Sequence, residues 1–164
     1  AFNAGQFGPE SMSRTLAEHF ALIEDEYADA LAHPLSARRA MLVAALLARF
    51  TDRVFERYRP DAPDRVFSAA DGPAYRDRLR AASPALATIF ALCTVPPGAA
   101  LEVAPVEVPI ADYGRLSVED FMVSLYNGNT VQRVVITRPG EGQPLVHPVL
   151  GEAIAWWRGS GAVA

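Results

Sequence analysis

The sequence contains no lysine and a single cysteine, Cys93, so all fifteen of its basic residues are arginines and no disulfide can form within the chain. An unpaired cysteine is typical of proteins in a reducing compartment, and we expect a cytoplasmic protein. The longest uncharged stretch, residues 81–101, is interrupted by three prolines and is not a continuous apolar span of the ~20 residues that a membrane-spanning helix requires, so we expect no membrane contact.

Motifs that mark common enzymes are also missing from the sequence. It contains no Walker motif, no dinucleotide-binding glycine motif, no G-x-S-x-G and no H-E-x-x-H. His19, Glu26 and His33 follow one another at seven-residue steps, which separates neighbours by roughly 10.5 Å along a helix, too far to share one ion. Cys93 ends an apolar segment, where a thiol is usually buried and inert. We therefore expect no metal and no cofactor, and an enzyme only if its site is assembled from scattered residues.

What is present indicates a globular α+β protein. The chain has 164 residues, of which 51 % are hydrophobic and 21 % are charged, as is usual for one folded domain. Helical patterns come first and strand patterns follow, which favours an N-terminal block of about four helices, then a small antiparallel sheet of two to four strands and a C-terminal helix. The expected organisation is a flexible arm over 1–10, a single domain over 11–159 (helical block 11–95, α/β part 99–159) and a tail over 160–164.

The helical block begins with two long helices. The first is expected from about Ser13, a good N-cap residue, to about residue 32, because apolar residues recur there at three- and four-residue steps. The second is expected from a cap at Ser36 to about Tyr58. Its first half, residues 40–48, is apolar on all sides and is predicted to be a buried central helix. Two short helices follow, opening at Asp71-Gly-Pro73 and at Ser83-Pro84.

The second part of the chain alternates strand and helix signals. Residues 101–110 alternate apolar and polar side chains, and two prolines confine them to a sheet edge. Residues 117–128 have a capping residue, helical spacing and a glycine stop, which favours a helix. At a period of two, however, they lead into Asn127-Gly128, a hairpin signal. Residues 130–137 form the clearest strand, and a last helix is expected from Pro148 to Gly159.

Charge is unevenly distributed along the acidic chain, whose net charge is −4. Residues 38–80 hold ten arginines and six acidic residues, and Arg49, Arg53 and Arg57 project from one face of the second helix at four-residue steps. Such a row can bind anionic groups bidentately. Asp52 and Glu56 are close enough to pair with it, so a salt-bridged solvent face is the favoured interpretation. We expect no nucleic-acid binding.

Two features predict a partner surface. The last helix needs only the stripe of Leu150, Ile154 and Trp157 to attach to the domain, yet a second stripe of Val149, Ala153 and Trp156 lies about 100° away. Tryptophan is a frequent anchor of protein interfaces. The strand at 101–110, with Val106 and Val108, offers an edge to which an extended peptide could be added.

These observations favour a non-catalytic accessory or adaptor subunit that binds a protein or peptide, or a second copy of itself, through the last helix and the sheet edge. The alternative is a small enzyme or ligand-binding protein whose site lies between the helical block and the sheet. Candidate groups for that site are His19, His147, Tyr126, Asn127 and Arg133.

Overall fold

The computed structural model describes residues 14–163 and is mostly helical, with a two-stranded antiparallel sheet. Residues 1–10, which were expected to be flexible, and Ser13, the expected start of the first helix, lie outside the described residues. In chain order the elements are α1 (Leu16–Ala32), α2 (Ala37–Tyr58), the 3₁₀ helix η1 (Pro63–Val66), α3 (Gly72–Ala82), α4 (Pro84–Cys93), β1 (Ala100–Glu107), η2 (Ile110–Arg115), α5 (Val118–Tyr126), β2 (Thr130–Thr137) and α6 (Val146–Gly159).

Polar caps set the starts of most α-helices. At α1 the Thr15 hydroxyl accepts the Glu18 N–H at 3.1 Å and the Glu18 carboxylate accepts the Thr15 N–H at 2.7 Å, a reciprocal capping box. The cap is therefore Thr15, two residues later than predicted. Ser36 accepts the Arg39 N–H at 3.2 Å and starts α2, as predicted. The last helix starts at Val146, two residues before the expected Pro148.

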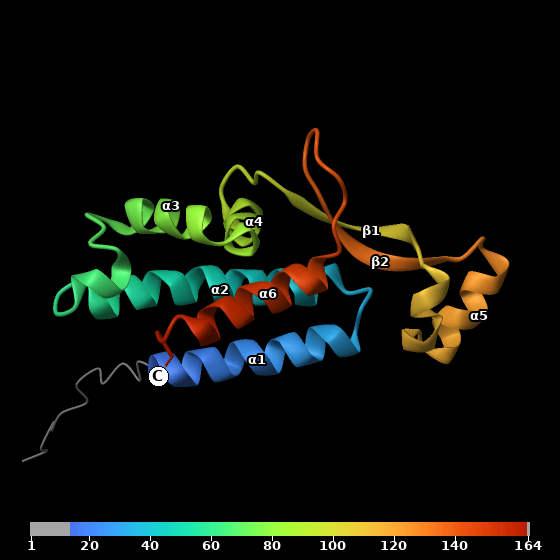
Figure 1. Ribbon diagram of the computed structural model, residues 1–164, viewed down its shortest axis with the longest axis horizontal. Helices are drawn as coiled ribbons and strands as arrows, with labels where there is room; N and C mark the ends of the chain where they lie inside the picture. Colours follow the sequence, from blue (N-terminus) through green and yellow to red (C-terminus); the bar gives the residue numbers. More distant parts are fainter. Residues whose placement is uncertain (1–13, 164) are drawn as a thin grey trace, which may run out of the picture.

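Helix α2 lies at the centre of the body, and α1, α4 and α6 pack against it (Figure 1). Leu47 and Phe50 are fully buried in this core. The prediction that residues 40–48 are buried on all sides is wrong at Leu42 and Ala45, which are exposed. The neighbouring helices cover α2 on the sides that carry Val43 and Leu47 and leave another side of the helix to solvent.

Helix α6 lies against α1 and α2. Its Trp157 ring meets the Phe50 ring edge-on, with centroids 5.1 Å apart. A Cβ added at Gly151 would lie 2.6 Å from the Tyr27 hydroxyl, so a larger residue there would displace the Tyr27 side chain. The Tyr27 hydroxyl also donates a 3.2 Å hydrogen bond to the His147 carbonyl. Burial and close approach together fix α6 in the body.

Residues 100–137, here called the arm, extend away from this helical body (Figure 1). Strands β1 and β2 pair antiparallel in a register that runs from Ala100↔Thr137 to Glu107↔Thr130. Helix α5 follows η2 and lies beyond the far end of the two strands (Figure 1). The helical interpretation of residues 117–128 is confirmed and the hairpin alternative is wrong. Gly128 adopts a φ of +63° just after the helix, the left-handed conformation that suits a glycine stop.

Candidate functional site

The arm carries most of the exposed large hydrophobic side chains of the described chain. Eight of the thirteen large hydrophobic side chains that are exposed lie on it, although it is a minor part of the chain. Val118 is 80 % exposed, Leu125 57 % and Tyr126 83 %. The others are Val103, Ile110, Phe121, Met122 and Val123. Clusters of this kind mark interaction sites on folded proteins.

The exposure follows from how α5 is attached. Ser117 accepts the Asp120 N–H at 3.1 Å and starts the helix. Its main contact with other elements is β2, where the Arg133 guanidinium donates to the Asp120 carboxylate at 2.8 Å. Ser124 is the one fully buried residue of α5. A nine-residue helix held at one side by an ion pair leaves its apolar residues uncovered.

The charges of the arm are unbalanced toward the negative. It holds two arginines and five acidic residues. Arg133 is paired with Asp120, and Arg115 lies 3.9 Å from Asp112. The remaining carboxylates have no ion pair within residues 14–163 and are exposed; they are Glu102, Glu107 and Glu119. The apolar cluster is thus accompanied by free negative charge.

The sheet edge predicted from the sequence belongs to the arm. Val106 and Val108 are half-buried, and the Val108 N–H donates to the Asn129 carbonyl at 2.8 Å. The outer edge of β2 is partly used, because the Ile136 N–H donates to the Pro144 carbonyl at 2.8 Å. Within the described part of the chain, β1 pairs with β2 alone, which leaves its other edge without a neighbouring strand.

The second stripe of α6 is not a continuous exposed strip. Ala153 is fully buried, because α6 packs with α1 and α2 on one side and with α4 and β2 on others. Val149 and Trp156 are half-buried against the core. The Trp156 ring packs edge-on against Trp157 at 4.9 Å and lines a cavity of about 300 Å³. Trp156 is therefore one wall of an aromatic pocket rather than a projecting side chain.

The arginine row of α2 is divided between different contacts. Arg49 lies 3.8 Å from Glu56, and Arg57 lies 4.0 Å from Asp61. Arg53 donates to the Arg14 carbonyl and contacts His19. The predicted partner Asp52 pairs instead with Arg76 of α3 at 2.8 Å, because α3 packs on that side of α2.

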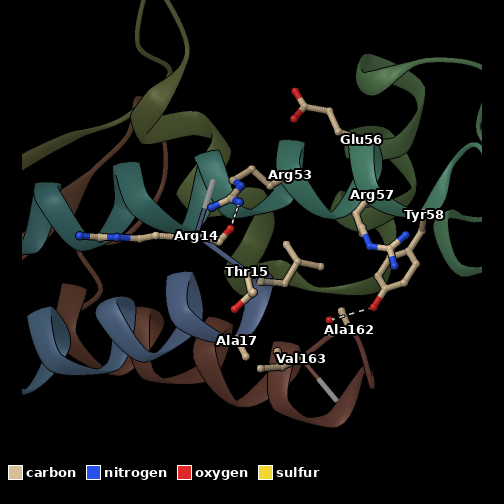
Figure 2. A pocket seen from close by; sticks show the side chains of 10 residues that line it. Arg14, Thr15, Ala17, Arg53, Glu56, Arg57, Tyr58, Ala162 and Val163 are labelled. Carbon is tan, nitrogen blue, oxygen red and sulfur yellow. Dashed lines mark hydrogen bonds between the residues drawn. The ribbon is translucent and has the colours of Figure 1, made fainter. Parts of the chain in front are cut away.

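Two residues of this row line a cleft of about 520 Å³ at the start of α1 (Figure 2). Arg53 and Arg57 approach it from α2, and residues 162–163 of the C-terminal tail form the opposite wall. Arg49 is not among the lining residues. The sequence pointed to the row, but the contribution of the α1 start and the tail is a product of the fold.

The five candidate groups of the enzyme hypothesis share no hydrogen bond or ion pair within residues 14–163. Tyr126 and Asn127 lie at the end of the arm, while His19 and His147 are buried in the body. Burial is the main cause that lowers the pKa of both histidines. Burial likewise raises the pKa of the Cys93 thiol, which opposes thiolate formation.

Neither a metal cluster nor a membrane span is found in the described residues. Residues 14–163 contain no group of three or more His, Cys, Asp and Glu side chains arranged to hold an ion. None of their helices has both the length and the apolar character needed to cross a bilayer. The candidate sites are therefore the arm, the aromatic pocket and the arginine cleft.

Sequence reasoning missed the exposed face of α5, although it recognised the helix. Val118, Phe121, Met122 and Leu125 have the spacing of a buried stripe. The available signal was that this short helix has more apolar residues than a single buried face can hold.

Compared with known proteins, the chain matches no protein-family model, no curated protein and no solved structure.

Proposed function

We propose that this protein is a non-catalytic binding module that docks a partner protein on its arm. The observation that carries the proposal is the cluster of exposed apolar side chains on α5, centred on Val118, Leu125 and Tyr126. Burying these side chains against a partner would stabilise the complex by roughly 25 cal/mol per Å² of apolar surface removed from water. Tyr126 has the large amphipathic ring that often anchors an interface.

The charges of the arm specify the partner's surface. The arm holds five acidic residues and two arginines, of which Arg133 is held by Asp120 at 2.8 Å, so its net charge is negative. A partner that presents apolar side chains rimmed by Arg or Lys would cover the cluster and pair with Glu119 near its border. Such complementarity raises association rates and selects among partners more than it raises affinity.

The open edge of β1 offers a second element of the same surface. An extended segment of the partner that pairs there would use backbone groups for affinity and the half-buried Val106 and Val108 for contact. Pro105 interrupts the donors of that edge, which limits promiscuous pairing without closing it. The last helix is not part of this proposal, because Ala153 is buried and Trp156 packs on Trp157.

Photo-crosslinking from defined positions tests the proposal. A benzoylphenylalanine in place of Tyr126 should crosslink a partner protein in cells of the host, whereas the same residue in place of Ala28, exposed on α1, should not. Capture from both positions alike would contradict docking on the arm. A crosslink between two copies of the chain would identify the partner as a second copy.

Binding to the partner so identified should then depend on the arm. Leu125→Glu is expected to weaken the affinity by about tenfold or more, equal to about 1.4 kcal/mol, because a charge replaces an apolar contact. Glu119→Arg should slow association and weaken its salt dependence, because the arm becomes less negative. Unchanged affinity in Leu125→Glu, with the fold intact by circular dichroism, would refute the proposal.

A further inference from the structure

The arginine cleft of Figure 2 lies at the end of the body remote from the arm, and the docking surface does not involve it. Its volume is about 520 Å³, within the range of small-molecule sites. It is lined by Arg14, Thr15, Leu16, Ala17, Arg53, Glu56, Arg57, Tyr58, Ala162 and Val163.

The cleft has an excess of positive charge. Three of its lining residues are arginines and one is acidic. That acid, Glu56, is directed away from Arg57 and Thr15 in Figure 2 and lies 3.8 Å from Arg49. The pKa of His19, which contacts Arg53, is lowered by burial and further by the charges of Arg53 and Arg14, as expected in a region of positive potential.

Arg57 is the cation best placed to meet a ligand. Its guanidinium lies beside the Tyr58 ring, and its one ion-pair partner within residues 14–163 is Asp61 at 4.0 Å, with both side chains largely exposed. A pair so exposed contributes little and exchanges readily for another anion. Arg53 is more firmly held, because it donates to the carbonyl of Arg14, whose own side chain runs in the opposite direction from Arg57 (Figure 2).

The cleft also contains apolar side chains. Leu16 comes from α1 and Val163 from the C-terminal tail, and the Tyr58 ring closes one side. The Tyr58 hydroxyl donates to the Ala162 carbonyl at 3.3 Å, which fixes the tail against α2. The cleft therefore presents cationic side chains next to apolar ones, with the polar side chain of Thr15 among them.

We propose that this cleft binds an organic carboxylate, with the carboxylate on Arg57 and Arg53 and an apolar body against Leu16, Tyr58 and Val163. A guanidinium donates two parallel N–H bonds to a carboxylate, and a small inorganic anion would leave the apolar walls uncovered. The carboxylate belongs either to a free acid or to the C-terminus of a peptide, and the two sources offer the same chemistry.

Calorimetric titration of the full chain with matched probes tests the proposal. Octanoate should bind, whereas 1-octanol, which lacks the charge, and inorganic phosphate, which lacks the apolar body, should bind at least about tenfold more weakly. The peptide acetyl-Gly-Leu-Leu with a free carboxylate is compared with its C-terminal amide. Preference for octanoate identifies a free acid as the ligand, and preference for the peptide carboxylate identifies a chain terminus.

Variants of the lining locate the binding. Arg57→Ala should weaken carboxylate binding by about tenfold. Arg57→Lys should recover part of the affinity, because lysine keeps the positive charge but cannot donate two parallel N–H bonds to the carboxylate. Ala17→Trp should block the cleft without changing its charge, because Ala17 is an exposed lining residue. Arg78→Ala is the control, since Arg78 lies on α3 outside the cleft and changes the net charge equally.

Three results would overturn the proposal. In the first, octanol or the peptide amide binds as tightly as the corresponding carboxylate. In the second, phosphate binds as tightly as octanoate. In the third, Arg57→Ala and Arg78→Ala weaken binding equally. Absence of any carboxylate binding in the folded wild-type protein, verified by circular dichroism, would overturn it as well.

Discussion

The helical body and the arm are built from similar apolar residues but use them in opposite ways. In the body, Leu47, Phe50 and Trp157 are covered by neighbouring helices. In the arm, α5 has a comparable apolar pattern, and yet Ser124 is its one buried residue. A periodic apolar stripe therefore shows that a helix has a face to cover, but not whether the same chain covers it. We expect the two regions to differ most in how substitutions affect folding.

The largest loss of stability is expected from Trp157→Ala in the body. Trp157 is 1 % exposed and packs on Phe50 and Trp156, so its removal should cost about 3–5 kcal/mol through lost burial and a cavity. Trp156→Ala should cost clearly less, because its ring is half-buried. Urea unfolding of both variants measures the difference. Equal losses would show that the two rings are equivalent parts of the core.

Leu47→Ala should destabilise the body by about 2–5 kcal/mol, since Leu47 is fully buried on the central helix. Equilibrium unfolding in urea gives the value. The exposed Leu42 on the same helix provides the matched control, and Leu42→Ala should have a much smaller effect. A loss below about 1 kcal/mol for Leu47→Ala would contradict the central position of α2.

Mild acid should weaken the body before it affects the arm. Burial lowers the folded-state pKa of His19 and of His147 below the usual value of 6.5, so the unfolded chain takes up protons first. Stability should fall as the pH drops below about 6.5 and continue to fall to the folded-state pKa values. In the arm, Arg133 lowers the pKa of Asp120 below its usual 3.8, so that pair is lost only at lower pH.

Unfolding experiments at about pH 7.5 and about pH 5.5 measure this dependence. His19→Gln and His147→Gln should each reduce it, because a neutral amide takes up no proton. His33→Gln serves as the control, since His33 is exposed at the end of α1. The explanation fails if the two buried-site variants keep the full pH dependence of the wild type.

The smallest effect on stability is expected in the arm. Leu125→Ala should change the free energy of unfolding by no more than about 0.5 kcal/mol, because the side chain is 57 % exposed. Urea unfolding of the isolated protein provides the measurement. A loss comparable to that of Leu47→Ala would show that α5 packs against the rest of the protein, and would remove the basis for a docking surface.

Much of the architecture followed from local chemistry in the sequence. The Ser36 cap, the strand over 130–137 and the choice of helix over hairpin at 117–128 were all correct, because capping residues, periodicity and a left-handed glycine act over a few residues. The start of α1 was placed too early because Ser13 and Thr15 are both competent caps. Thr15 has Glu18 at the position that completes a capping box.

The sequence by itself determined the order and the approximate positions of the α-helices and strands, and placed Arg49, Arg53 and Arg57 on one face of α2. It did not predict the two 3₁₀ helices, and the strand expected over 101–110 ends at Glu107 because η2 begins at Ile110. Only the tertiary structure decided which apolar faces are covered. It buried Ala153 of α6, exposed Leu125 and Tyr126 of α5, and joined Arg53 and Arg57 to the C-terminal tail in one cleft. The physical reason is that burial and convergence depend on contacts between residues far apart in the chain, as between Tyr58 and Ala162, whereas caps and periodicity are complete within a few residues.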